Sequence, residues 1–113
     1  MKRTPWGKVV SVSNVATGLD VVRAVDSEGN RCGGIRLSPQ RRRQIDRLFK
    51  FQPSAPGNWF EWQSEWIVPV LVFRSEFTDD YLIERAVSGM ECHDDDERYD
   101  DVRAWWNRQL VVA

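Results

Sequence analysis

Cys32 and His93 are the two residues whose side chains could perform covalent chemistry together. A cysteine thiolate is a strong nucleophile, and a histidine can act as the base that activates it. Three consecutive acidic residues follow the histidine and could orient it: Asp94, Asp95 and Asp96. However, His93 is the single histidine of the chain, and no local nucleophile signature surrounds Cys32. A Cys32-dependent thiol enzyme is therefore the third of three hypotheses, and we expect the protein not to be an enzyme.

Two arginines, Arg31 and Arg36, stand close to Cys32 in the sequence and are expected to lower the pKa of its thiol. Cysteine and histidine are also metal ligands, but no paired Cys-x-x-Cys spacing occurs, and the adjacent Cys92 and His93 form a poor chelate. We therefore expect no metal and no cofactor. Because nothing marks the chain as exported, both cysteines are expected to be reduced thiols.

Five cations lie between residues 41 and 50 and could bind phosphate groups: Arg41, Arg42, Arg43, Arg47 and Lys50. Ser38 and Pro39 predict that a helix begins here, because serine is a favoured N-cap and proline suits the first helical position. Arg43, Arg47 and Lys50 are expected to share one face of that helix. Positive charge at a helix start opposes the helix dipole, which suggests a use beyond folding. The second hypothesis is therefore a small nucleic-acid-binding accessory protein, although a pI of 5.8 is low for that class.

Six carboxylates lie within eight residues near the C-terminus: Asp94, Asp95, Asp96, Glu97, Asp100 and Asp101. Acidic residues at a helix start are favoured by the helix dipole, so folding explains part of this run. Six carboxylates nevertheless exceed what a helix cap needs. Such an acidic face could imitate nucleic-acid phosphates in front of the basic groove of a nuclease or DNA-recognition complex.

Charge is divided between the two halves of the chain. Residues 1–50 carry 11 Lys and Arg against 4 Asp and Glu, whereas residues 51–113 carry 5 against 13. The six tryptophans are also more than the core of a small domain needs, and tryptophan is enriched at the energetic centres of interfaces. We therefore expect aromatic anchors for a partner among four of them: Trp59, Trp62, Trp105 and Trp106.

The first third of the chain predicts a three-stranded antiparallel meander. Residues 8–15, 19–26 and 31–37 have the composition of strands and are separated by two turns that contain glycine. The pair Gly33-Gly34 in the third strand indicates a bulge or the close approach of another backbone.

The middle of the chain fits both a helix and a strand. Trp59, Trp62 and Trp66 would share a helical face, whereas alternate apolar residues in the same region fit a strand. Pro69 argues against a long regular helix. We therefore expect a helical turn at the start of this region and a strand over residues 66–73.

Two further helices are expected after the middle region. Asp79 predicts the N-cap of one, and Gly89 predicts its end. The last helix is expected over residues 95–110. The helix that begins after Ser38 should bury one stripe of side chains: Ile45, Leu48 and Phe49. The predicted fold is a single α+β domain over residues 1–113, in which the N-terminal antiparallel meander packs against about three helices.

Three short motifs stand out in the first two thirds of the chain: Thr4-Pro5-Trp6-Gly7, Cys32-Gly33-Gly34-Ile35-Arg36-Leu37-Ser38, and Trp59-Phe60-Glu61 with Glu65-Trp66. Together they resemble an uncharacterised domain family of phage and plasmid accessory proteins. In that family the pattern has a histidine at the position of Cys32 and acidic residues at the positions of Trp62 and Gln63. If the family has a polar active site, it is altered in this chain.

The resemblance implies a mobile-element origin, and small proteins of that origin often inhibit host defence systems by binding them. We therefore expect a non-enzymatic protein-binding inhibitor that blocks a host nucleic-acid-targeting defence complex, of which an anti-CRISPR protein is one form. Its partner would be a host defence protein or ribonucleoprotein, with nucleic acid as the alternative. The chain has neither an apolar run long enough for a membrane span nor a signal peptide, so we expect it in the cytoplasm of a bacterial host.

Overall fold

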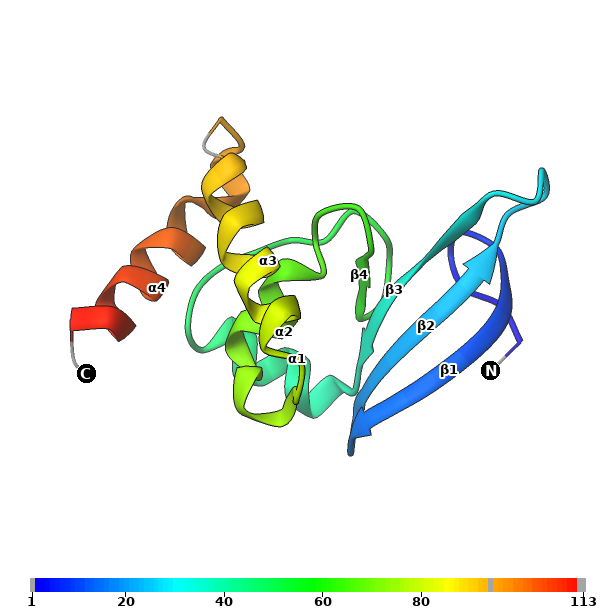
Figure 1. Cartoon of the computed structure of the whole chain (residues 1–113), viewed down its shortest axis with the longest axis horizontal. Coiled ribbons are helices and arrows are strands. Elements are labelled where there is room, and N and C mark those ends of the chain that lie inside the picture. Colours follow the sequence, from blue (N-terminus) through cyan, green and yellow to red (C-terminus); the bar gives the residue numbers. More distant parts are fainter. Residues whose placement is uncertain (1, 94, 112–113) are drawn as a thin grey trace.

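The first three strands form the antiparallel meander that the sequence predicts. The computed structural model describes residues 2–93 and 95–111 (Figure 1). In these residues the sheet has four strands, in the spatial order β1-β2-β3-β4: β1 (Lys8–Ala16), β2 (Leu19–Val25), β3 (Arg31–Leu37) and β4 (Trp59–Glu61). Glycine makes the two hairpin turns possible, because Gly18 and Gly29 have positive φ angles of 75° and 82°.

The helices gather at one end of the sheet (Figure 1). The described residues form α1 (Pro39–Asp46), α2 (Ile67–Val72), α3 (Asp80–Cys92) and α4 (Asp100–Val111), with 3-10 turns at Arg74–Glu76 and Glu97–Tyr99. Ser38 caps α1 as predicted, since its side chain accepts a hydrogen bond from the N–H of Arg41. The predicted α+β class is confirmed.

One face of the sheet packs against these helices. Strand pairing places Leu19 opposite Leu37 and Val21 opposite Ile35, so these side chains point to the same face. That face and the helices share one hydrophobic core, which includes Leu19, Ile35, Leu37, Ile45, Phe60, Val68 and Leu71. The other end of the sheet, with the turn between β2 and β3, extends away from the helices (Figure 1).

The prediction for the middle of the chain is wrong, because the strand comes first and the helix second. Residues 59–61 pair with β3, where Phe60 lies opposite Ile35. The apolar stretch that follows is α2, which is buried on nearly all sides, packs on α3 and shares the hydrophobic core with the sheet. Pro69 is tolerated because it is the third residue of α2, where the N–H has no partner within the helix.

The boundary predicted for α3 is correct at its start and wrong at its end. The carboxylate of Asp79 accepts hydrogen bonds from the N–H groups of Tyr81 and Leu82, as expected of an N-cap. The helix continues past Gly89 to Cys92. A Cβ at position 89 would lie 2.7 Å from Cδ1 of Ile67, so this glycine allows α2 and α3 to approach closely.

Two other helix predictions need correction. Leu48 is 41% exposed because α1 ends at Asp46, whereas Ile45 and Phe49 are buried as expected. The last α-helix begins at Asp100 rather than near residue 95, since a separate 3-10 turn precedes it.

Candidate functional site

A groove of about 660 Å³ opens on the sheet. In the described part of the chain its lining comes from β1, β2, β3, the N-terminal segment and the residues at and after the end of β4, without any helix residue. Much of the lining is apolar, from Trp6, Val21, Val25 and Trp62, and the charged residues are Arg23, Arg31 and Glu61. Ligand pockets typically measure roughly 300–1,000 Å³, so the groove has a suitable size for a ligand or a short segment of a partner.

The N-terminal turn carries Trp6 into this groove. The hydroxyl oxygen of Thr4 accepts hydrogen bonds from the N–H groups of Trp6 (3.1 Å) and Gly7 (3.0 Å). A Cβ on Gly7 would lie 2.1 Å from the carbonyl oxygen of Val25, so glycine is needed for the turn to reach β2. The rings of Trp6 and Trp59 then meet edge to face, with centroids 5.7 Å apart.

Two glycines in β3 allow its neighbours to come close. Gly33 has a φ of 126°, and a Cβ there would lie 2.2 Å from the carbonyl oxygen of Val22. A Cβ on Gly34 would lie 2.1 Å from the carbonyl oxygen of Phe60 on β4. These contacts confirm the close backbone approach that the Gly33-Gly34 pair predicts. The N–H of Trp62 then donates to the carbonyl oxygen of Gly33 at 2.9 Å, which holds Trp62 at the groove.

The three sequence motifs meet at this groove. Trp6 comes from the first motif, Cys32 and Gly33 from the second, and Glu61 from the third. Cys32, Trp62 and Gln63, where the sequence is expected to depart from the family pattern, are also among the lining residues. The fold therefore brings residues of three motifs that are far apart in the sequence together at one groove.

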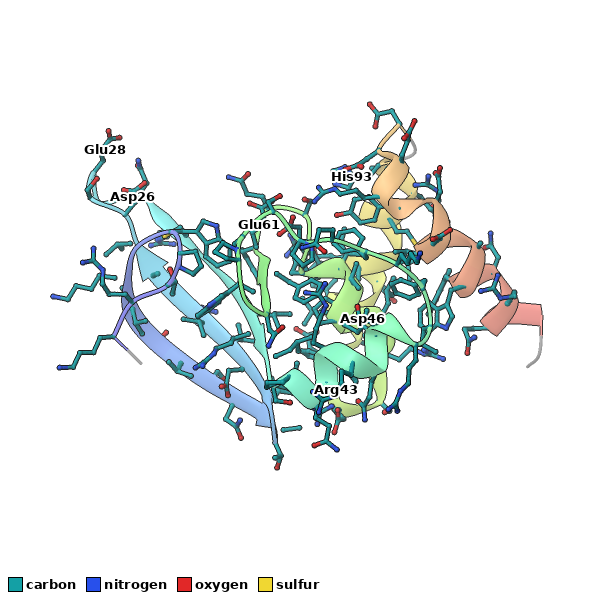
Figure 2. The ribbon with its side chains drawn as sticks, turned by 180° about the vertical axis from the view of Figure 1, so that it is seen from behind. Asp26, Glu28, Arg43, Asp46, Glu61 and His93 are labelled. Atoms are coloured by element: carbon teal, nitrogen blue, oxygen red, sulfur yellow. The ribbon has the colours of Figure 1, made fainter. Side chains whose placement is uncertain are left out.

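Cys32 and His93 do not share a site. Cys32 pairs with Ala24 in the sheet, next to the turn that holds Asp26. Figure 2 shows Asp26 and His93 at opposite ends of the molecule. His93 instead stacks on Tyr99, with ring centroids 5.3 Å apart.

The predicted effect of the arginines on Cys32 is also wrong. Partial burial raises the pKa of the Cys32 thiol, and the negative charge of Asp26 raises it further. Cys32 and Cys92 are both free thiols, as expected. A thiol with a raised pKa is a weaker candidate for a nucleophile at neutral pH.

The main polar cluster lies beside the groove residues and was not predicted. Glu65 is fully buried, and its carboxylate accepts hydrogen bonds from Ser54 N–H (2.8 Å), Ser54 Oγ (2.7 Å) and Arg98 (2.7 Å). Burial alone would raise the pKa of Glu65, but the hydrogen bonds from Ser54 and Arg98 outweigh it and hold the pKa below its usual value. The sequence does contain one sign of this cluster, since Glu65 stands just before the apolar residues of α2. A carboxylate that is buried with such residues needs hydrogen-bond partners.

The stability of the protein is expected to fall as the pH drops below about 4.5, the usual pKa of a glutamic acid. A carboxyl whose pKa is lower in the folded state stabilises the fold above its unfolded pKa, and this stabilisation is lost as the pH falls through the folded pKa. Urea unfolding at several pH values between 7 and about 2.5 measures the effect. The Glu65→Gln variant should depend less steeply on pH over this range, and equal slopes for the two proteins would contradict the assignment.

The five cations expected to bind phosphate have different surroundings in the structure. Arg41 donates two hydrogen bonds to Glu76, one of them at 2.9 Å, and Arg42 donates to Asp46 at 3.2 Å. These two arginines therefore stabilise the fold. Their ion pairs also offset the unfavourable interaction of positive charge with the start of a helix. Arg43, Arg47 and Lys50 are exposed, but α1 ends at Asp46, so Arg47 is its C-cap and Lys50 lies beyond the helix.

A second hollow of about 540 Å³ adds a cation to this basic region. Arg47 and Lys50 line it together with Arg108 of α4. Asp46 and Asp101 lie in the same hollow, so its charge is mixed. Sequence reasoning missed Arg108, because it is separated from Lys50 by more than half of the chain.

The acidic run is partly neutralised where the structure describes it. Asp96 pairs with Arg98 and Asp100 pairs with Arg103. The exposed acidic residues that form no ion pair in the described part of the run are Asp95, Glu97 and Asp101. Asp94 lies outside the described residues.

The four expected aromatic anchors have different surroundings. Trp62 is 41% exposed and lines the groove, whereas Trp105 is 6% exposed and packs on Phe49 in the core. Trp59 and Trp106 are half-buried, the latter beneath the guanidinium of Arg74. Of the four expected anchors, Trp62 therefore has the most exposed surface.

These features define an α+β protein whose antiparallel sheet carries a groove built by strands and loops. The chain belongs to a family described as a domain of unknown function (DUF7007), whose model matches residues 1–108. No curated protein and no solved structure is significantly similar to it. Among residues 2–93 and 95–111, no helix combines the length and apolar character that a membrane crossing requires.

Proposed function

We propose that the protein is a non-enzymatic binding module that recognises a partner protein through the groove. The observation that carries this proposal is the exposed Trp62 in a groove where three separate motifs meet. Tryptophan in an apolar pocket with a polar rim is typical of the energetic centre of an interface. The distance between Cys32 and His93 removes the support that a thiol enzyme had in the sequence.

The specific form of the proposal is an inhibitor of a host nucleic-acid-targeting defence complex, acting from a phage or another mobile element. This form rests on the resemblance to phage and plasmid accessory proteins, and an anti-CRISPR protein is one example of it. The exposed Asp95, Glu97 and Asp101 would add long-range attraction to a basic partner. A bacterial cytoplasm is the compartment that such a target requires.

Nucleic-acid binding is the second candidate function. The fold places Arg108 beside Arg47 and Lys50, so three cations from two elements line one hollow. Each cation in contact with a phosphate makes binding more sensitive to salt. The acidic side chains in the same hollow weaken this candidate, and we rank it below protein binding.

Capture of host proteins on immobilised protein tests the proposal. The wild type should retain a partner that the Trp62→Ala variant loses, because truncation of a central tryptophan typically costs at least about 2 kcal/mol of binding, roughly a thirtyfold loss of affinity. Tyr81→Ala is the matched control, since Tyr81 is 66% exposed and lies on α3, outside the groove. Retained proteins are identified by mass spectrometry after nuclease treatment.

The outcomes separate the hypotheses. Loss of the same protein from both variants, or from neither, would overturn the groove as the binding site. Retention that disappears after nuclease treatment would favour nucleic-acid binding. If the captured partner depends on Trp62 but does not act on nucleic acid, the binding-module proposal is supported and its specific form as a defence inhibitor is excluded.

A further inference from the structure

The exposed end of the sheet carries three cations on one face. Strand pairing places Lys8 opposite Val25 and Val25 opposite Arg31. Arg23 lies two residues before Val25 on β2 and therefore points to the same side. Directly paired residues of an antiparallel sheet share a face. Lys8, Arg23 and Arg31, all exposed, thus form one surface, here called the basic sheet face.

The basic sheet face continues into the groove. Arg23 and Arg31 line the groove together with the apolar Val25, and Trp62 forms part of its wall. Arg23 lies opposite Gly33, which has no side chain to fill the space between Arg23 and Trp62. An apolar surface with a tryptophan is therefore placed directly beside two guanidinium groups.

In the described part of the chain, the acidic groups near this surface form no ion pair with its cations. Asp26 is used within the turn, where its carboxylate accepts the N–H groups of Glu28 and Asn30, each at 2.9 Å. Glu28 is exposed in the same turn, and Glu61 lines the groove. None of the ion pairs between described residues involves the basic sheet face. Its cations are free to meet negative charge on a partner.

We propose that the groove binds an extended segment of the partner protein in which acidic and bulky apolar residues occupy alternate positions on one side. This inference rests on the proposed protein-binding function and names the segment that is recognised. Every second side chain of an extended chain points the same way, at a spacing of about 6.6 Å. A bulky apolar side chain would pack between Trp62 and Val25 while neighbouring carboxylates meet Arg23 and Arg31.

A peptide suits this surface better than single-stranded nucleic acid. Nucleic acid would place phosphates on the arginines and a base on Trp62. Trp6 is the second aromatic residue of the lining, but its ring already packs on Trp59, and the carboxylate of Glu61 would repel a backbone that carries a charge at every nucleotide. A peptide can instead place apolar side chains on the valines and limit its charges to the arginines.

Selection of peptides on the immobilised full-length protein tests this inference. The probe is a library of random 12-residue peptides displayed on phage, and enriched sequences are then synthesised with a fluorescent label for anisotropy titration. The wild type should enrich peptides with Asp or Glu two residues from Trp, Phe or Leu. The Arg23→Glu/Arg31→Glu variant should bind these peptides at least about tenfold more weakly and should enrich basic peptides instead. Arg43→Glu/Arg47→Glu is the control with the same change of charge outside the groove.

Three results would overturn the inference. They are enrichment without an excess of acidic residues, equal weakening by both charge-reversed variants, and binding of a 12-nucleotide single-stranded DNA that depends on Arg23 and Arg31. Failure of the inference can be told from failure of the proposed function. A host protein whose capture needs Trp62 but neither arginine would leave the binding module in place and exclude the acidic segment. If the selected acidic peptides bound but no host protein were captured, the groove's preference would stand and the proposed binding of a host protein would fail.

Discussion

Replacement of Arg98 by methionine is expected to destabilise the folded protein by about 3 kcal/mol. The guanidinium of Arg98 donates to the fully buried carboxylate of Glu65 at 2.7 Å and to Asp96 at 3.2 Å, and it lies over the ring of Phe51. Methionine keeps most of the apolar packing but removes the charge. Glu65 would then be a buried anion without its cation, which is more costly than the loss of an exposed ion pair. The side chain of Arg98 is 35% exposed, so solvent screens part of the effect.

Urea unfolding followed by circular dichroism measures this change. Arg108→Met is the matched control on α4, since Arg108 is exposed and forms no ion pair within the described residues. It should change stability by less than about 0.5 kcal/mol. In a double-mutant cycle, Glu65→Gln combined with Arg98→Met should cost clearly less than the two single changes together. Additive effects, or equal effects of Arg98→Met and Arg108→Met, would show that the buried pair does not hold this region together.

Substitution of Gly34 by alanine is expected to destabilise the protein by at least about 3 kcal/mol. The added Cβ would lie 2.1 Å from the carbonyl oxygen of Phe60 and 2.9 Å from Cα of Glu61, and both are backbone atoms that cannot rotate away. β3 and β4 would have to separate. This movement would displace Phe60 from the core and Trp62 from the groove, so partner binding should be lost with stability.

Gly29→Ala is the matched control for this change. Gly29, unlike Gly34, has a positive φ, but a Cβ there meets no atom within 4 Å. Gly29→Ala should therefore destabilise the protein only by the cost of placing a non-glycine residue at a positive φ, about 1–2 kcal/mol. Thermal unfolding of both variants, followed by tryptophan fluorescence, compares the two effects. If Gly34→Ala were no more destabilising than Gly29→Ala, the close approach of β3 and β4 would not be a requirement of the fold.

Local signals account for the parts of the fold that the sequence predicts correctly. The meander follows from valine-rich strands and glycine turns, and the starts of α1 and α3 follow from Ser38 and Asp79. Each of these features depends on residues within a few positions of one another. The order of strand and helix in residues 59–72 depends instead on pairing with β3 and burial against α3. No pattern within that segment distinguishes the two possibilities.

The candidate site shows the same division between local and distant effects. The sequence predicts that Trp62 is an anchor and shows the three motifs, but it does not place them around one groove. From the sequence, both Arg41 and Arg42 are expected to be available to bind phosphate. In the structure Arg41 instead pairs with Glu76, which is 35 positions away. The partnership of Glu65 with Arg98 spans 33 positions. Side-chain type alone does not reveal which distant partner a charge will meet.

The sequence by itself therefore determines the α+β class, the meander, two helix caps and the division of charge between the halves of the chain. These properties follow from composition and from interactions between neighbouring residues. Only the tertiary structure decides which charged side chains form ion pairs and which functional side chains lie next to one another. Folding pairs Arg41 and Arg98 with distant carboxylates, separates Cys32 from His93, and joins Trp62 to the basic sheet face. Burial and long-range contacts set the energies of these groups, and neither is encoded in local spacing.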